Sequence, residues 1–203
     1  MFNTEIIPAA EIQRALKTLQ HGGIVAFPTD TVYGLGALAF DNPAIESIYT
    51  AKDRPIEKAI PILIGDLSDL DQAAVNIPDM AFRFAARFWP GPLTCIVPKK
   101  PTLPPAISAT LTVAVRIPNH PDALALLRAA GPMAVTSANL SGQASPVTAQ
   151  AVYEQLQGRI PLILDGGQTP GGTPSTLVDC TGESPKILRE GPILLEELLS
   201  ALE

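Results

Sequence analysis

The chain has 203 residues, of which 46% are hydrophobic and 17% are charged, a composition that allows a sizeable core and excludes a disordered chain. Its formal net charge of −6 argues against a general nucleic-acid surface, because such a surface needs clustered Lys and Arg. No apolar run reaches the roughly 18 residues of a membrane span, and the order of residues at the N-terminus is not that of a signal peptide. We therefore expect a soluble, cytoplasmic protein.

Helices and strands are predicted to alternate along the chain. Apolar residues at helical spacing, bounded by caps, glycines or prolines, predict helices at 8–20, 42–52, 78–88, 121–130, 148–156 and 193–202, with a helical turn at 66–71. Short apolar runs predict strands at 24–27, 60–64, 93–97, 112–118, 133–136, 162–164, 175–180 and 187–189, the last two forming a hairpin. With no internal repeat and no long linker, this order indicates one α/β domain with a mixed sheet and one concave site, spanning 1–203.

A polar segment follows the strand at 24–27. Residues 28–36 read PTDTVYGLG, which places two hydroxyls, a carboxylate and a phenol directly after a buried strand. Gly34 and Gly36 allow a ligand or another backbone to come close. Open α/β sheets bind ligands at the carboxyl ends of their strands, so a site is expected here. An ordinary polar turn has the same composition, and this segment alone does not decide between the two.

Basic residues are concentrated rather than spread evenly. Lys52, Arg54 and Lys58 lie within seven positions, in a loop at the end of a helix that Pro55 should terminate. Arg116 lies near the end of a predicted strand. These cations, together with Arg189, suit a polyanion such as a nucleoside triphosphate. The hydroxyls of residues 28–36 could contribute to the same site. A solvated run of charges remains the alternative for the first cluster.

A second hydroxyl-rich segment follows the strand at 133–136. Ser137, Asn139, Ser141 and Ser145 could cap the next helix, or they could face a phosphate. The sequence contains neither the Gly-Lys-Ser/Thr signature of a P-loop nor a Gly-x-Gly-x-x-Gly fingerprint, so neither common nucleotide-binding fold is indicated. A serine hydrolase is poorly supported, because no Gly-x-Ser-x-Gly segment is present.

Cysteine and histidine do not indicate a metal site. Cys95 and Cys180 stand alone in the sequence, so buried free thiols are expected. His21 and His120 are the two imidazoles of the chain, which makes a His/Cys zinc site improbable. We therefore predict no tightly bound protein metal.

Six segments of the chain are specific enough to compare with known families: PTDTVYGLG at 28–36, KDRP at 52–55, WPGPLT at 89–94, VAVRIP at 113–118, SANLSG at 137–142 and LREG at 188–191. Together, and in this order, they closely resemble the YrdC-like threonylcarbamoyl-AMP synthases. The resemblance covers nearly the whole chain, from about Ile6 to Gly191. Longer members of that family carry an additional C-terminal domain, so the chain resembles the short, single-domain form.

The resemblance implies a twisted, mixed, open sheet flanked by helices around a central, positively charged hollow. It also implies an enzyme that combines L-threonine, bicarbonate and ATP, accompanied by Mg²⁺, into threonylcarbamoyl-AMP and pyrophosphate. The product would serve a separate transferase complex, which forms threonylcarbamoyladenosine at position 37 of tRNAs that read codons beginning with A. Little or no direct tRNA binding, and no membrane binding, would be expected of the protein itself.

The resemblance also implies roles for individual residues. Lys52 and Arg54 would act at the reacting centre, and two departures from the family pattern, Lys58 and Leu63, bear on how phosphate and threonine are bound. The residues expected to bind ATP are Arg54, Lys58, Thr112, Ser137, Asn139, Ser145 and Arg189. The residues expected to bind L-threonine are Thr31, Arg116 and Ser175.

Two alternatives remain open at this point. One is a related enzyme of the same fold with other carbamoyl or nucleotidyl chemistry, such as the module of hydrogenase maturation factors that makes carbamoyl-AMP. The other is a non-enzymatic RNA-binding module, which the acidic net charge disfavours. Segments 99–105 and 166–174 are candidates for a mobile lid, since a labile adenylate must be kept from water.

Overall fold

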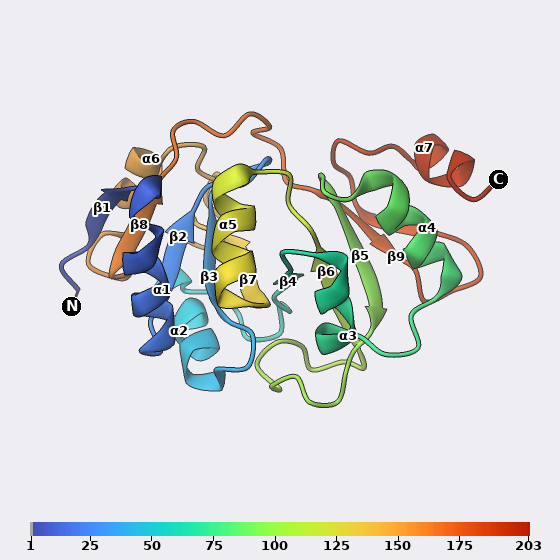
Figure 1. The fold of residues 1–203 in the computed structure, drawn as a ribbon, viewed down its shortest axis with the longest axis horizontal. Helices are drawn as coiled ribbons and strands as arrows, with labels where there is room; N and C mark the ends of the chain where they lie inside the picture. Colours follow the sequence, from blue (N-terminus) through green and yellow to red (C-terminus); the bar gives the residue numbers. More distant parts are fainter. Residues whose placement is uncertain (1) are drawn as a thin grey trace.

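Ten strands form one mixed sheet, with helices packed on both of its faces (Figure 1). The computed structural model describes residues 2–203. The strands are β1 (Glu5–Pro8), β2 (Val25–Phe27), β3 (Gly34–Leu38), β4 (Ile62–Leu63), β5 (Leu93–Pro98), β6 (Thr112–Arg116), β7 (Met133–Ser137), β8 (Leu162–Asp165), β9 (Thr176–Asp179) and β10 (Lys186–Arg189). The helices are α1 (Ile12–Gln20), α2 (Asn42–Lys52), α3 (Leu70–Ala73), α4 (Asp79–Phe88), α5 (Pro121–Ala130), α6 (Ala149–Leu156) and α7 (Leu195–Ser200).

The strand order is β1-β8-β2-β3-β7-β4-β6-β5-β9-β10. Parallel pairs join β8 to both β1 and β2, β4 to β6, and β5 to β9, whereas the other neighbours are antiparallel. The N-terminus lies at one end of the sheet and the C-terminus at the other (Figure 1). The expected mixed sheet flanked by helices is confirmed.

Most of the predicted elements are present, with shifts at their ends. The helix expected at 8–20 begins only at Ile12, because Glu5–Pro8 forms the edge strand β1 and Ala9–Glu11 a short 3-10 turn. The helix at 121–130 and the antiparallel hairpin of β9 and β10 are confirmed. The expected strand at 60–64 contracts to the two residues of β4.

Strand β3 was not predicted, because its sequence, GLGAL, has the glycine content of a loop. It forms because β2 pairs with it on one side and β7 on the other. Gly34 borders the central cavity, where a ligand could come close as the sequence suggested, and both glycines also leave room for neighbouring side chains. A Cβ on Gly34 would lie 2.7 Å from Val135 Cγ1, and one on Gly36 would lie 2.9 Å from the end of Met133. Side chains of β7 therefore occupy the space that the glycines leave.

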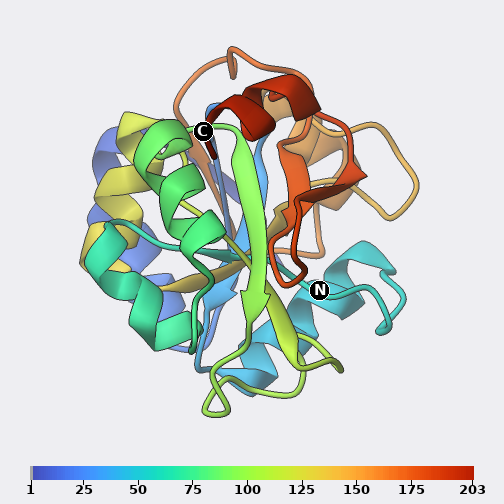
Figure 2. The same cartoon turned by 90° about the vertical axis from the view of Figure 1, so that its right-hand side faces the viewer.

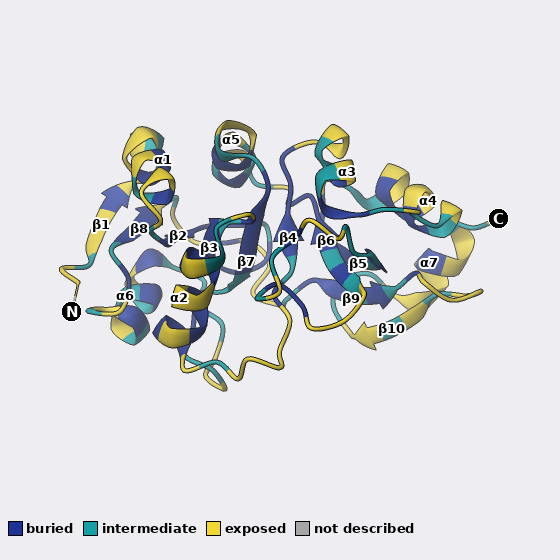
Figure 3. Cartoon of the chain, turned by 90° about the horizontal axis from the view of Figure 1, so that it is seen from below, coloured by how far each residue is buried: buried dark blue, intermediate teal, exposed yellow. Residues whose placement is uncertain are grey.

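Helices α1 and α5 pack together on one face of the sheet, over a cluster of apolar side chains that includes Leu16, Phe27 and Leu127. A larger apolar cluster holds α2, α6, α3 and α4 against the sheet. In Figure 3 the central strands are buried, whereas the outer sides of the helices and the edge strand β10 are exposed. Figure 2, which looks onto the β5 end of the molecule, shows α4 on one side of β5 and the β9–β10 hairpin on the other.

The two cysteines are buried free thiols, as expected. A hydrogen bond with Cys180, followed by burial, raises the pKa of the Cys95 thiol well above its usual value. Among the described residues, no helix combines the length and the hydropathy that crossing a membrane requires.

Candidate active site

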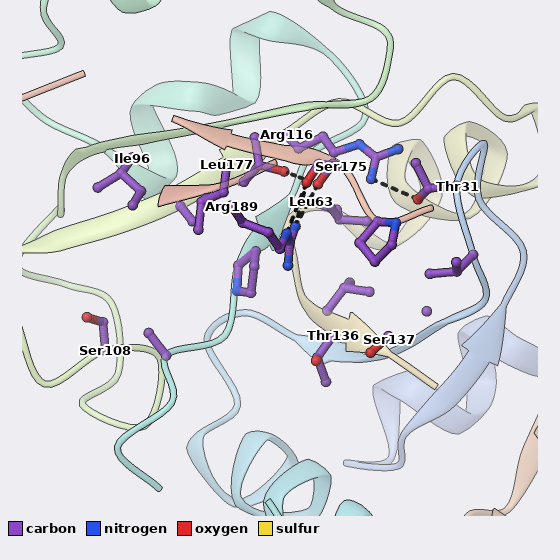
Figure 4. Close-up of a pocket in the computed structure, with 18 of the residues that line it drawn as sticks. Thr31, Leu63, Ile96, Ser108, Arg116, Thr136, Ser137, Ser175, Leu177 and Arg189 are labelled. Atoms are coloured by element: carbon purple, nitrogen blue, oxygen red, sulfur yellow. Dashed lines mark hydrogen bonds between the residues drawn. The ribbon is translucent and has the colours of Figure 1, made fainter. Parts of the chain in front are cut away.

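A cavity of about 380 Å³ lies over the central strands, on the part of the sheet formed by β4, β5, β6 and β9 (Figure 4). Side chains alternate between the two faces of a strand, and on β5 this places Thr94 and Ile96 on the cavity and Leu93, Cys95 and Val97 in the core. The same alternation on β6 and β9 gives the cavity a floor of hydroxyl and aliphatic side chains.

Three arginines from distant parts of the chain line this cavity: Arg54, Arg116 and Arg189. Arg54 follows α2, Arg116 ends β6 and Arg189 ends β10. Of these three arginines, only Arg116 has a carboxylate partner among the residues that the structure describes. The cavity therefore carries excess positive charge, as expected for a site that binds an anion.

The end of α2 determines where Arg54 lies. Asp53 adopts the left-handed conformation, with φ of 50°, and its carboxylate accepts a hydrogen bond from Arg159 at 2.8 Å. This residue ends the helix, so the chain turns between Lys52 and Arg54. The Arg54 guanidinium then donates to the carbonyls of Lys58 and Ala59, at 3.2 and 2.9 Å. These two bonds hold the side chain while leaving other N–H groups for a ligand.

Arg116 is held on three sides, and its side chain is 6% exposed. Its Nε donates to Gly91 O at 2.9 Å, its Nη1 to Thr31 Oγ1 at 3.1 Å, and its Nη2 to the Asp30 carboxylate. The PTDT segment and the turn after α4 thus fix the guanidinium plane. One N–H on each of Nη1 and Nη2 remains for a ligand, which is the arrangement that a carboxylate can accept.

Arg189 lies against the residue that precedes β9. Its Nε and Nη2 donate to Ser175 O at 3.1 and 2.8 Å, and Nη2 also donates to Ser175 Oγ at 3.0 Å (Figure 4). The Ser175 hydroxyl lies 2.7 Å from Thr94 Oγ1. A chain of hydrogen bonds therefore connects the arginine on the edge strand to the centre of the cavity floor.

Burial lowers the pKa values of all three arginines, and repulsion from a neighbouring arginine adds to the lowering at Arg116 and Arg189. Burial is the largest cause for each of them. The charge of Arg54 adds to the lowering at Arg189, and that of Arg189 to the lowering at Arg116, where the nearby carboxylate of Asp30 partly offsets it. Each charge thus makes its neighbour less favourable, and an anion placed among them would relieve that repulsion.

Seven of the predicted site residues line this cavity, and four do not. Those that line it are Arg54, Thr112, Ser137 and Arg189 from the expected ATP site, and Thr31, Arg116 and Ser175 from the expected threonine site. Those that lie outside its lining are Lys52, Lys58, Asn139 and Ser145. Lys58 is exposed and Ser145 half-buried. Asn139 is buried, and its amide donates to the carbonyls of Leu140 and Gln143.

Lys52 was expected in one loop with Arg54 and Lys58. It is instead the last residue of α2, before the turn at Asp53, and its side chain points away from that loop. The residue is 1% exposed, and its ammonium donates to the carbonyls of Ser137 and, at 2.5 Å, of Asn139. It thereby holds the segment after β7 in place. A direct catalytic role for Lys52 stays a prediction, and the contacts of its ammonium are those of a residue that shapes the site.

We expect Lys52 to make stability depend on pH. Burial, followed by the charge of Arg54, lowers the pKa of Lys52 from 10.5 to about 7. Between these two values the unfolded chain binds a proton that the folded protein does not, so the free energy of unfolding should rise with pH across this window. Lys52→Met should flatten that rise, and the exposed Lys17→Met should not. Urea unfolding at several pH values from about 7 to 10 measures the slopes, and equal slopes in wild type and Lys52→Met would contradict the shift.

Several residues of the site were not among the candidates. Thr94, Ser108 and Thr110 line the cavity with hydroxyls, and Glu57 is the one carboxylate among its described lining residues. Thr94 carried a usable signal, because it is the polar residue of the apolar run Leu93–Val97. The serine and threonine at 108 and 110 lie in a loop, where polar residues carry no such signal.

The segment at 166–174, a candidate lid, lies against the PTDT segment. Gly172 N donates to Thr31 O at 2.8 Å, and the Tyr33 hydroxyl donates to Gly167 O at 2.7 Å. A Cβ on Gly171 would lie 2.7 Å from Asp30 O, so this contact requires glycine. Burial raises the pKa of Tyr33 to about 12, which keeps its hydroxyl protonated as a donor. Opening of this segment stays a prediction.

A mixed α/β sheet whose central strands carry an arginine-lined, hydroxyl-rich cavity defines an anion-binding α/β protein of the kind that accommodates nucleotides. The family described as "Telomere recombination", whose members include Sua5, YciO and YrdC, matches residues 17–191. The chain belongs to this family. The resemblance seen in the six motifs is thereby confirmed.

Named relatives of this chain are threonylcarbamoyl-AMP synthases. The one from Bacillus subtilis is 46% identical over 93% of this chain and 55% of its own length. The one from Pyrococcus abyssi is 44% identical over 96% of this chain and 58% of its own length. The chain thus spans little more than half of these relatives. A crystal structure of P. abyssi Sua5 complexed with L-threonine superposes with a TM-score of 0.93, at 42% identity, over 100% of this chain and 60% of the other.

Proposed function

We propose that the protein is an L-threonylcarbamoyladenylate synthase, a nucleotidyltransferase that converts L-threonine, bicarbonate and ATP into threonylcarbamoyl-AMP and pyrophosphate. The observation that carries the proposal is the convergence of Arg54, Arg116 and Arg189 on one cavity with a single ion-pair partner among them. The names of the relatives and the threonine complex of P. abyssi Sua5 support the choice of substrates.

In this proposal the triphosphate lies beside Arg54 and Arg189. Both side chains keep free N–H groups and are less buried than Arg116, and Thr112 and Ser137 line the same cavity. Mg²⁺ enters with ATP as part of the substrate, because Glu57 is the one carboxylate of the described lining and a single carboxylate does not form a resident metal site. Among residues 2–203, no cluster of His, Cys, Asp and Glu could hold a metal ion.

L-Threonine lies deeper in the cavity, with its carboxylate on Arg116. One N–H group on each of Nη1 and Nη2 has no partner among the described residues, and charged N–H donors of this kind bind a carboxylate strongly. Thr31 fixes the plane of the guanidinium, and Ser175 provides a hydroxyl nearby. Leu63 lines the same cavity and supplies an apolar wall.

The reaction needs no covalent enzyme intermediate. Bicarbonate gives carbon dioxide and hydroxide, the neutral amine of threonine attacks the carbon dioxide, and the proton that the amine loses combines with the hydroxide to form water. An oxygen of the resulting carbamate then attacks the α-phosphate. The bond between the α-phosphate and the β-phosphate breaks, and pyrophosphate leaves with Mg²⁺. The protein contributes position and positive charge: Arg54 and Arg189 stabilise the negative charge that builds up on the phosphoryl oxygens and on the departing pyrophosphate.

The product is an activated carbamate, which a second enzyme would consume. We propose that a transferase complex uses it for threonylcarbamoyladenosine at position 37 of tRNA, in the cytoplasm. The protein would then contact tRNA weakly or not at all, since its net charge is −6 and Arg54, Arg116 and Arg189 line the cavity.

Pyrophosphate release by the purified protein tests the proposal. We expect release from ATP and Mg²⁺ that depends on both L-threonine and bicarbonate, with L-serine and glycine as weaker substitutes because they lack the methyl group or the whole side chain. Mass spectrometry should detect threonylcarbamoyl-AMP. Release that is indifferent to threonine, or none at all, would contradict the proposal and favour another carbamoyl or nucleotidyl reaction.

A further inference from the structure

Two buried hydroxyls meet on the floor of the cavity. Thr94 is the second residue of β5, and Ser175 directly precedes β9, which pairs with β5 in parallel. The two residues are 2% and 4% exposed, and their hydroxyl oxygens are 2.7 Å apart. Both residues line the cavity. The six motifs assign no role to Thr94.

The protons of this pair can be counted. A hydroxyl donates one hydrogen bond and accepts up to two. One hydroxyl of the pair donates to the other, and Arg189 Nη2 donates to Ser175 Oγ at 3.0 Å. The residues that the structure describes make no other hydrogen bond with these two oxygens. Whichever hydroxyl donates within the pair, the proton of the other remains for a ligand in the cavity.

The hydroxyl pair of Thr29 and Thr31, in the PTDT segment, has no such proton. Thr29 Oγ1 donates to Val32 O at 2.7 Å, because a carbonyl can only accept. Its 3.0 Å contact with Thr31 Oγ1 must then be donated by Thr31, whose oxygen in turn accepts from Arg116. Both protons are used within the protein. Thr31 can therefore orient Arg116 or accept from a ligand, but it cannot donate to a ligand without breaking an existing hydrogen bond.

We propose that Thr94 is a positioning residue for the amino-acid substrate: its hydrogen bond with Ser175 orders the pair so that the pair presents a free hydroxyl proton to the ligand. This inference rests on the proposed function, since it takes the ligand to be an amino acid with a carboxylate or hydroxyl oxygen that accepts. Thr94 holds Ser175 Oγ from one side and Arg189 holds it from the other, so the hydroxyl cannot turn away. The same contacts link the amino-acid end of the cavity to an arginine of the phosphate end.

Three variants separate this role from a merely structural one. Thr94→Val keeps the shape and removes the hydroxyl, whereas Thr94→Ser keeps the hydroxyl. Thr176→Val is the matched control: Thr176 is fully buried on the neighbouring strand, does not line the cavity, and exchanges two 2.9 Å hydrogen bonds with the backbone of Ile193. For each variant, pyrophosphate release is measured against L-threonine and against ATP, and L-threonine binding is measured by calorimetry with a non-hydrolysable ATP analogue.

For Thr94→Val we expect KM and Kd for L-threonine to rise about tenfold, the effect of one lost hydrogen bond. KM for ATP and kcat should stay within about twofold, because the arginines keep their other hydrogen bonds. Thr94→Ser should restore wild-type values, and Thr176→Val should leave KM for L-threonine unchanged.

Unchanged threonine binding in Thr94→Val would overturn the inference, as would an equal loss in Thr94→Ser or in Thr176→Val. The proposed function fails separately, if the wild-type protein releases no threonine-dependent pyrophosphate. In that case the calorimetric comparison of wild type with Thr94→Val still decides the inference, and a wild-type protein that does not bind L-threonine overturns it.

Discussion

Arg54→Ala is expected to lower kcat/KM for pyrophosphate release by about a hundred- to a thousandfold, the effect of removing one well-placed donor from a developing negative charge. Arg54 has no carboxylate partner among the described residues, and its guanidinium is held by two backbone carbonyls at the edge of the cavity. Its removal therefore takes away charge that nothing else in the protein neutralises. Steady-state kinetics at saturating L-threonine and bicarbonate measure the loss.

The matched control for this variant is Arg83→Ala. Arg83 is an exposed arginine on α4, paired with Asp79 four residues earlier, and it lies outside the cavity lining. We expect its activity to remain within about twofold of wild type, because an exposed ion pair of this kind contributes little. Arg54→Lys should fall between the two, since it keeps the charge and loses the planar fork. Equal losses in Arg54→Ala and Arg83→Ala would contradict the assignment of the phosphate site.

Arg116→Ala is expected to abolish threonine-dependent pyrophosphate release. It should also lower the free energy of unfolding by about 3–5 kcal/mol, the effect of breaking a buried ion pair. The Asp30 side chain is 10% exposed, and without Arg116 its carboxylate would remain buried and unpaired. Gly91 O and Thr31 Oγ1 would lose their donors as well. Urea unfolding measures the stability, and threonine titration measures the function.

The double variant Asp30→Asn with Arg116→Ala separates these two effects. Neutralising Asp30 removes the unpaired charge, so part of the lost stability should return. Threonine-dependent activity should not return, because the carboxylate of the substrate still has no guanidinium. Recovery of activity in the double variant would mean that Arg116 acts through the fold and not through the substrate.

The two strands that sequence reasoning missed share a physical cause. Helix α5 was predicted because its caps and apolar spacing are local signals, which its own residues carry. Strand β3 has glycine at two of its five positions, and it exists because strands far away in sequence pair with it on both sides. Strand β1 is short and ends in proline, and it pairs only with β8. Pairing partners of this kind cannot be read from a local pattern.

The residues of the site divide in the same way, into those that local signals predict and those whose placement depends on the folded structure. Arg116 and Arg189 were found because each is a cation at the end of a predicted strand, in a motif of the family. The separation of Lys52 from Arg54 was not found, because it depends on the left-handed conformation of Asp53, which an aspartate adopts only when its surroundings favour it. The availability of a hydroxyl proton at the Thr94–Ser175 pair depends on contacts among β5, the residue before β9, and β10, which no spacing in the sequence records.

The strand order also determines when, during folding, a binding site can exist. Only β2 with β3, β5 with β6, and β9 with β10 are neighbours in both sequence and sheet. Every other neighbour must be brought together across a long stretch of chain, and such high contact order is associated with slow folding. Arg189 lies on the last strand and contacts Ser175 within the β9–β10 hairpin, and this hairpin is joined to Thr94 only when β9 pairs with β5. The arginine cavity is therefore complete only in molecules whose C-terminal hairpin has paired with β5.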